Sequence, residues 1–457
     1  MGSILIVQCW KININLGLPG FLLNNTQEIK MKRFVVITVI VWMCQLAVAQ
    51  NAIDKVIRLS DVERIEKKLA SDEMEGRRAG SPGIDKAAAF ISNEFKTAGL
   101  QPLEGSSSYL QSFATLKPKF ISAAGKFDGV SIDQKNIISY TAKPSLKITH
   151  ESGFEIVQVK ATDTFRPGSM LQSKKNLLVL VHPAHEKIFA NLARYKPETF
   201  STERSLFFVQ TDIVPKQFSL EATHEFTEKK LANVVGIVPG KSKKDEYVIF
   251  SAHYDHLGIG KPNEAKDSIF NGANDDASGT TAVIVLANYF KKLNNNERTL
   301  IFVAFTAEES GGFGSQYFSQ QLDPAKIAAM FNIEMIGTHS KWGANSAFIT
   351  GYEKTDMGKI LEKNLQGSQF KFYPDPYPEQ QLFYRSDNAT LARQGVAAHT
   401  ISTSKMDVEK FYHTQEDEFE TLDMKNMTEI IKAIAISSTS IVTAKETPSR
   451  VDASTLR

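Results

Sequence analysis

The stretch SAHYDH at residues 251–256 places two histidines and an aspartate directly after the apolar run YVIF. A strand end can become polar simply because it emerges into solvent. Imidazole nitrogens and carboxylate oxygens are also zinc ligands, so His253 is a candidate ligand and Asp255 a candidate for orienting it. The choice between these interpretations depends on whether the rest of the chain supplies partners.

Further histidine and carboxylate side chains follow other apolar runs. Asp275 lies in the loop NGANDDASG, Glu308 and Glu309 follow LIFVAF, Glu334 lies in FNIEMIG, and His413 lies in FYHTQEDE. Taken alone, an Asp-Asp pair is usually a helix cap and a Glu-Glu pair a solvated turn. Glu334 is harder to explain in this way, because a carboxylate among apolar neighbours is costly unless it is paired.

Together, these residue types are typical of a site for two metal ions. Two histidines and three carboxylates can hold two ions when one carboxylate bridges them, and such a pair clamps a water and a carbonyl oxygen. One glutamate of the adjacent pair then binds metal, and the other takes a proton from the water. The chain has only two cysteines, Cys9 and Cys44. This argues against a closed structural zinc site.

The elements that must position these residues alternate between strands and helices. Strand candidates lie at 232–238, 247–250, 299–305, 330–336, 347–349 and 396–401, and helix candidates at 279–293 and 424–442. This alternation predicts an α/β domain with a mainly parallel mixed sheet flanked by helices. In such sheets the ligand site lies beyond the carboxyl ends of the strands, where the candidate residues fall.

The segment 117–229 has a different character. It alternates short β-like runs with charged and proline-containing turns. We therefore expect an inserted, mostly β domain there. The α/β domain is expected to comprise residues 50–116 and 230–457.

The N-terminus has the pattern of a secretory signal. Residues 31–49 have a basic start, an apolar stretch and small residues at the end, which predicts cleavage near Ala49–Gln50. We then expect residues 1–30 to be an upstream translation artefact and Met31 to be the true start; a long signal with an unusual leader is the other interpretation. We expect an exported protein, periplasmic or extracellular. The apolar run is too short for stable membrane insertion, and the net charge of +2 gives no reason to expect nucleic acid as a partner.

Five segments in series resemble the signature segments of family twenty-eight of the metallopeptidases. They are HYDHLG, GANDDASG, AFTAEESGGFGSQYF, NIEMIG and YHTQEDE. This family contains bacterial zinc aminopeptidases, aminopeptidase Y and glutamate carboxypeptidase. The resemblance spans roughly residues 71–105 and 230–440. The insert occupies the place where many members carry a protease-associated domain.

The resemblance implies the zinc exopeptidase fold, which is phosphorylase/hydrolase-like, with two zinc ions. It implies that His253 and Glu334 hold one ion, that Glu309 and His413 hold the other, and that Asp275 bridges both.

Three further roles follow from the same resemblance. Glu308 is expected to be the general base, Asp255 to fix the tautomer of the preceding histidine, and Tyr412 to polarise the scissile carbonyl. Members of the family often have a cis peptide bond after the bridging aspartate, here between Asp275 and Asp276.

The chain departs from the family pattern at two positions. Glu334 stands where members usually have aspartate. Glutamate is one methylene longer and still an oxygen donor, so metal binding is expected to survive with altered spacing. Asn388 follows Asp387 where many relatives have histidine, which affects inferences about the substrate pocket.

The expected function is a secreted zinc aminopeptidase that acts on peptide substrates. A glutaminyl cyclase of the same fold, which typically uses one zinc, is an alternative, and so is a carboxypeptidase. A non-enzymatic receptor or scaffold is a third alternative, and it predicts lost ligands. The intact His253 and the pair Glu308 and Glu309 favour two metals and hydrolysis.

Overall fold

The computed structural model describes residues 53–195 and 197–456. The expected upstream segment, 1–30, and the expected signal, 31–49, lie outside the described residues. The described residues from Ile57 onward form one compact unit. No helix in the described part of the chain combines the length and the apolar character needed to cross a membrane.

The strands extend over most of the chain. They are β1 (Leu110–Phe127), β2 (Val130–Ile132), β3 (Ile137–Tyr140), β4 (Ser145–Thr149), β5 (Glu155–Val159), β6 (Leu177–Val181), β7 (Leu206–Gln210), β8 (Phe218–Val238), β9 (Lys243–His253), β10 (Gly258–Ile259), β11 (Ile269–Phe270), β12 (Arg298–Phe305), β13 (Ile327–Ile333), β14 (Ser346–Ile349), β15 (Lys371–Pro374) and β16 (Ala398–Ser402). The α-helices are α2 (Leu59–Leu69), α3 (Pro82–Ala98), α4 (Pro167–Leu171), α5 (Glu186–Arg194), α6 (Ser278–Leu293), α7 (Phe313–Ser319), α8 (Met357–Asn364), α9 (Asn388–Ala392), α10 (Met424–Ser437) and α11 (Thr439–Val442).

The main sheet has ten strands and a parallel centre. Its order is β15-β14-β16-β13-β9-β12-β8-β1-β2, with β4 also paired to β8. The central strands β16, β13, β9 and β12 are mutually parallel, and antiparallel neighbours join them at β14 and β8. β12 is buried along its whole length, as expected for a strand that is covered on both faces. The predicted mixed α/β sheet is therefore confirmed.

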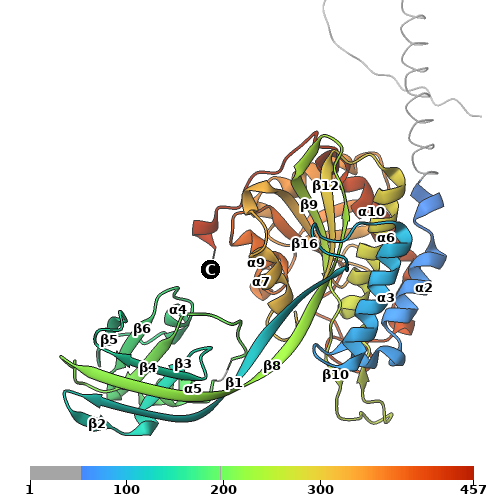
Figure 1. The fold of residues 1–457 in the computed structure, drawn as a ribbon. Coiled ribbons are helices and arrows are strands. Elements are labelled where there is room, and N and C mark those ends of the chain that lie inside the picture. Colours follow the sequence, from blue (N-terminus) through green and yellow to red (C-terminus); the bar gives the residue numbers. More distant parts are fainter. Residues whose placement is uncertain (1–52, 196, 457) are drawn as a thin grey trace, which may run out of the picture. The chain divides into compact units, whose positions relative to one another are not determined.

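Helices cover both faces of this sheet (Figure 1). On one face α6 packs against β9, β12 and β13, with α2, α3 and α10 beside it; on the other, α7 and α9 lie together. Most of α6 is buried, because its sequence TTAVIVLA is apolar on nearly every side. α3 begins at Pro82 and is followed by Gly99 at φ 79°, a left-handed conformation that glycine adopts without strain.

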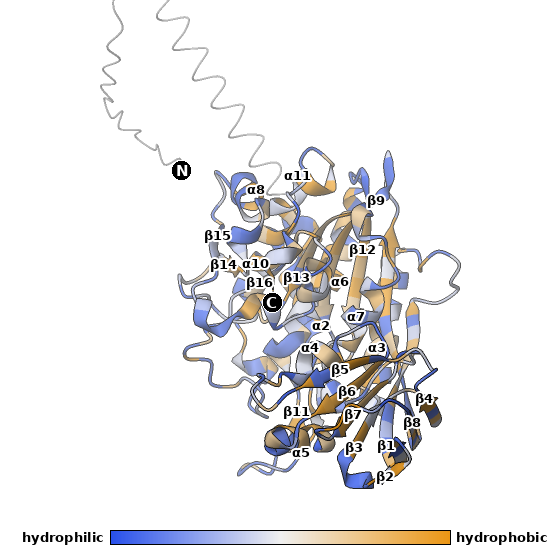
Figure 2. Cartoon of the chain, turned by 90° about the vertical axis from the view of Figure 1, so that its left-hand side faces the viewer, coloured by the Kyte–Doolittle hydropathy of each residue, from blue (hydrophilic) through white to orange (hydrophobic). Residues whose placement is uncertain are grey.

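Two long strands lead from the main sheet into the inserted segment. β1 and β8 pair antiparallel from Leu110↔Val234 to Phe127↔Phe218. The expected domain boundaries at 117 and 229 therefore fall inside continuous strands, and these boundaries stay a prediction. Within the segment a second sheet has the order β3-β7-β6-β5, in which β5, β6 and β7 are parallel. Their apolar residues stand out in Figure 2. The segment also contains the helices α4 and α5.

The topology brings three strand ends to one edge of the sheet. β13, β9 and β12 are neighbours and run in the same direction. β13 ends at Ile333, three residues before the predicted end, so Glu334 leaves the sheet at the strand terminus. This places the carboxylate at the edge and not between the apolar layers.

Candidate metal centre

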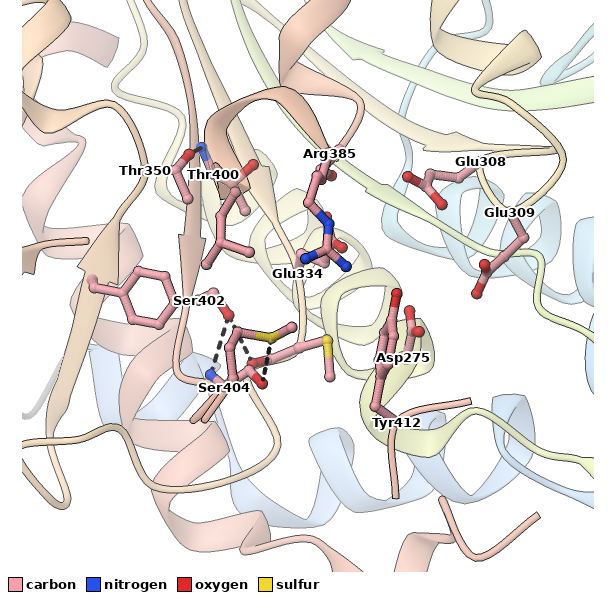
Figure 3. Close-up of a pocket in the computed structure, with 15 residues that line it drawn as sticks. Asp275, Glu308, Glu309, Glu334, Thr350, Arg385, Thr400, Ser402, Ser404 and Tyr412 are labelled. Atoms are coloured by element: carbon pink, nitrogen blue, oxygen red, sulfur yellow. Dashed lines mark hydrogen bonds between the residues drawn. The ribbon is translucent and has the colours of Figure 1, made fainter. Parts of the chain in front are cut away.

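The loops that follow β9 and β12 are tied together at the edge of the sheet. His253 is the last residue of β9, and it pairs in register with Phe305 at the end of β12. The Glu308 backbone N–H donates a hydrogen bond to Asp255 Oδ1 at 3.0 Å. Figure 3 shows the Glu308 and Glu309 side chains directed toward one cavity from adjacent positions of the loop after β12.

The loop that carries Asp275 is fixed by backbone hydrogen bonds to a distant carboxylate. The N–H groups of Asn274 and Asp275 donate to the two oxygens of Asp417, at 2.8 and 3.0 Å. The Asp275–Asp276 peptide bond is cis, as the family resemblance implied. Sequence reasoning did not identify Asp417, although it lies within the segment YHTQEDE that supplied His413.

Asp275 lies between two histidines with one oxygen facing each. Its Oδ1 is 3.2 Å from His253 Nε2, and its Oδ2 is 3.2 Å from His413 Nε2. Glu334 joins the first pair, because the ligand atoms of His253, Asp275 and Glu334 all lie within 4.8 Å of one another. One carboxylate thus belongs to two neighbouring groups of potential ligands.

The second group contains a histidine that the sequence analysis left out. His256 Nδ1 lies 2.9 Å from Glu309 Oε1 and 4.0 Å from Asp275 Oδ2. His413 Nε2 is 3.1 Å from the same Glu309 oxygen. The signal was present in HYDH, since the second histidine follows the first by three residues, but the resemblance assigned only the first.

The separations of these atoms fit ligands of a shared ion. With zinc–ligand bonds of about 2.0–2.1 Å, two ligands of a tetrahedral ion lie roughly 3.3 Å apart. Nε2 of His253, Nε2 of His413 and Oε2 of Glu334 are buried and have no hydrogen-bond partner among the described residues. A buried polar atom without a partner is costly, and a bound cation would satisfy all three. The nitrogen and oxygen donors therefore suit zinc.

Opposing effects set the charges in this cluster. Burial acts to raise the pKa of Asp275, but the contacts with His253 and His413 hold it below its usual range. Burial acts to lower the pKa of His413, and its contacts with Asp275 and Glu309 raise that pKa to about 10. Asp275 is thus an anion at neutral pH, as a bridging metal ligand must be.

Burial also governs the free carboxylate of the cavity. It raises the pKa of Glu308 well above the ordinary value, and nearby Glu334, Asp387 and Glu309 act in the same direction. His253 opposes this shift. A carboxyl with a raised pKa holds a proton more readily than an ordinary glutamate, which suits a group that accepts a proton and later returns it.

Asp255 contacts the site differently from the expected arrangement. The nearer acceptor for His253 Nδ1 is the Asp255 backbone carbonyl, at 3.1 Å, whereas the carboxylate Oδ1 lies at 3.8 Å. The carboxylate accepts the Glu308 N–H instead. The histidine tautomer is thus held by a carbonyl, and the Asp255 side chain holds the loop that bears the expected base.

Arg77 connects the two loops that carry the ligands. Its buried guanidinium donates to the carbonyl oxygens of Tyr254, Asn271 and Gly272, at 2.9, 2.6 and 2.9 Å. A further bond reaches the Leu69 carbonyl at 2.6 Å. Nothing in the sequence pointed to this role, because Arg77 lies in the polar, glycine-rich stretch SDEMEGRRAGSPG.

The two remaining residues of interest lie differently with respect to the cavity. Tyr412 lines it, and its ring stacks on that of His413 with centroids 3.8 Å apart. Asn388, the second departure from the family pattern, is fully buried and bonds Thr400 Oγ1 and the Phe383 carbonyl. It braces the segment beside the cavity and does not line it.

Comparison with known proteins identifies the part of the chain that holds this centre. The family model described as peptidase family M28 matches residues 233–437. This segment belongs to peptidase family M28. The M28 segment contains every candidate ligand named above.

Curated relatives match over limited lengths. Aminopeptidase YwaD from Bacillus subtilis is 26% identical over 209 residues, which are 44% of this chain and 43% of the relative. A probable zinc metalloprotease from Pyrenophora teres f. teres is 33% identical over 109 residues, 23% of each chain. The matched segment therefore spans less than half the length of either relative.

Solved structures match over most of the chain. An aminopeptidase from Aneurinibacillus sp. strain AM-1 has a TM-score of 0.50 at 17% identity, covering 86% of this chain and 95% of that one. A zinc aminopeptidase from Bacillus subtilis has a TM-score of 0.50 at 16% identity, covering 85% and 97%. At these identities the likeness shows that the M28 segment and its surroundings share the fold of these enzymes.

The structure brings the sequence-predicted residues together at one edge of the sheet. They are His253, Asp255, Asp275, Glu308, Glu309, Glu334, Tyr412 and His413. The roles assigned to them stay predictions.

Proposed function

We propose that the protein is an exported exopeptidase with two zinc ions, an aminopeptidase that removes N-terminal residues from peptides. The observation that supports it most directly is the position of Asp275, with one carboxylate oxygen at each of two ligand groups. The M28 match and the aminopeptidase named among the relatives support the same activity.

The chain offers ligands for both ions. His253, Glu334 and Asp275 would hold the first, and Asp275, Glu309 and His413 the second. We assign His256 to the second ion as an additional ligand, because its Nδ1 lies against Glu309 and faces Asp275. When bound, such ions supply Lewis acidity and lower the pKa of bound water.

The chain's own groups then carry the protons. Glu308 takes a proton from the water that attacks the scissile carbonyl carbon, and it later gives the proton to the leaving amine. Burial raises the pKa of Tyr412, so its hydroxyl stays protonated. It can donate a hydrogen bond to the carbonyl oxygen as negative charge develops there.

The alternatives differ in their products. A carboxypeptidase would use the same centre on the other end of a peptide, and a glutaminyl cyclase would release ammonia from an N-terminal glutamine. The presence of two ligand groups favours hydrolysis over a one-zinc cyclase. It also weighs against a non-enzymatic scaffold, which has no need to keep them.

The decisive experiment uses residues 50–457 supplied with zinc. One peptide has an N-terminal glutamine and another an N-terminal leucine, both with free ends, and mass spectrometry identifies the products. Loss of the first residue, blocked by a chelator, is the expected result. Loss of the last residue would show a carboxypeptidase, and loss of ammonia alone would show a cyclase.

Glu308→Gln tests the role of the base. The variant should keep both ions, because Glu308 is outside both ligand groups, while kcat falls about 10²- to 10⁴-fold. Metal content by atomic emission and turnover by peptide hydrolysis are measured together. Near-normal kcat with full metal content would show that another group takes the proton.

Export is a separate part of the proposal. It rests on the pattern of residues 31–49. The N-terminal sequence of the protein recovered outside the cytoplasm should begin at Gln50, and a mature protein that retains residues 31–49 would contradict it.

A further inference from the structure

The cavity in front of the metal ligands contains one positively charged side chain. Four carboxylates line it, from Asp275, Glu308, Glu309 and Glu334, and Arg385 is the single cation among its lining residues in the described chain. Figure 3 shows the Arg385 guanidinium directed into the middle of the cavity, near Glu334.

Arg385 has little to bind within its own chain. It follows the helical turn Leu382–Tyr384, and its side chain is exposed. Its one side-chain acceptor among the described residues is Gln380 Oε1, at the long distance of 3.4 Å. Across the described residues no carboxylate oxygen approaches the guanidinium within 4.0 Å, although the cavity is rich in carboxylates. The guanidinium thus keeps most of its donors available.

Arg385 brings a positive charge to the cavity in which substrate would bind. Arginine presents paired N–H donors that match the two oxygens of a carboxylate, and this pairing is stronger than a neutral hydrogen bond.

We infer that Arg385 binds a carboxylate of the substrate, so that preferred peptides carry a negative charge beside the scissile bond. This inference rests on the proposed peptidase function. Two parts of a peptide supply the same chemistry: the side chain of an N-terminal aspartate or glutamate, and the terminal carboxylate of a very short substrate.

Matched substrates distinguish these two sources. Peptides of the form X-Ala-Ala-amide with X as Glu, Gln or Lys offer only a side-chain charge. Ala-Ala and Ala-Ala-amide differ only in the terminal carboxylate. A charged partner for Arg385 should raise kcat/KM roughly 10- to 100-fold within one of the two sets, consistent with a hydrogen bond between charged groups.

Arginine variants test the residue itself. Arg385→Gln should bring the preferred pair close to equal kcat/KM, mainly through KM, Arg385→Lys should restore part of the difference, and Arg385→Glu should shift preference toward X as Lys. Arg393→Gln, an exposed arginine that does not line the cavity, is the matched control and should keep the wild-type ratio.

The outcomes separate this inference from the proposed function. If the peptides of both sets are cleaved with no preference for a charged member, the role of Arg385 is overturned and the proposed peptidase function stands. If no peptide is cleaved, calorimetry with zinc-loaded wild type and Arg385→Gln still tests the inference. Glutamate and alanine probe carboxylate binding, with glutamine and alaninamide as neutral counterparts, and equal binding across both pairs would overturn it.

Discussion

At the scale of single residues, the sequence showed which side chains are of a type that binds metal. It did not show which other residues they would contact. The ligand types at 253, 275, 309, 334 and 413 could be read from the sequence because each interrupts or follows an apolar run. His256 and Asp417 lie within the same motifs. They could not be recognised as parts of the site from the sequence, because their roles depend on their distances to other residues in the folded chain. Asp417 accepts two backbone N–H groups that lie more than 140 residues away.

His256 gives a prediction at this scale. His256→Asn removes the Nδ1 that faces Glu309 and Asp275, so the affinity for the second zinc should fall about 10- to 100-fold while the first stays unchanged. Zinc titration against a chromophoric chelator measures both steps. His339→Asn, at an exposed histidine paired with Asp423, is the control. Two unchanged binding steps would show that His256 is not a ligand.

At the scale of elements, the central strands and α6 were predictable and the long ribbon was not. The strands β9, β12 and β13 were predictable because each contains an apolar run that is buried on both faces of the sheet. In its middle, β8 reads HEFTEKK and is largely exposed. A two-stranded ribbon that meets solvent on both faces carries no hydrophobic period, so periodicity could not detect it. The closing helix also divides, into α10 and α11, at Ser438.

Arg77 gives a prediction for the loops between elements. It ends a 3-10 segment and holds the carbonyls of Tyr254, Asn271 and Gly272, which flank two groups of ligands. Arg77→Lys should lose most of these bonds, because an ammonium cannot reach several carbonyls in the fixed geometry of a guanidinium. We expect destabilisation by about 3–5 kcal/mol and weaker binding of both zinc ions.

Urea unfolding and zinc titration measure the two effects of Arg77→Lys. Arg78→Lys, at the neighbouring exposed arginine, is the matched control and should change neither quantity appreciably. If zinc affinity were unchanged in a destabilised Arg77→Lys protein, Arg77 would serve the fold without positioning the ligand loops.

At the scale of the whole molecule, stability depends on pH through a carboxyl that is not one of the ligands. Glu66 in α2 is fully buried; Thr281 donates to its Oε2 at 2.6 Å, and its Oε1 has no partner among the described residues. Burial raises its pKa from 4.5 to about 8, against the opposing effects of Thr281 and Arg77. The folded state therefore holds a proton that the unfolded chain releases between these two values.

Glu66→Gln should remove this dependence. Because the folded pKa is the higher one, the wild type loses stability as pH rises from about 4.5 to 8. The free energy of unfolding of the variant should therefore increase relative to that of the wild type across that pH range, by an amount on the order of a few kcal/mol. Urea unfolding at pH 5, 7 and 8.5 measures the difference, with Glu63→Gln on the same helix as control. A difference that does not change with pH would contradict the prediction.

The pairing of β1 with β8 also bears on how such a chain can be shortened. Lys117 and Thr227 are opposite each other across the ribbon, so the chain leaves and re-enters the ribbon at adjacent points. Replacing residues 118–226 by Asn-Gly, which closes a two-residue hairpin, should leave an α/β protein that still binds zinc. Circular dichroism and zinc titration would show whether it does.

The adjacent positions at which the chain leaves and re-enters the ribbon bear on how the sequence can evolve. A segment inserted at the tip of a hairpin adds no crossing to the sheet and leaves every parallel neighbour of β9 in place. Selection can therefore enlarge, exchange or delete what lies beyond the ribbon while the ligand loops keep their register. The sequences of the insert and of the metal centre can thus diverge at different rates within one chain.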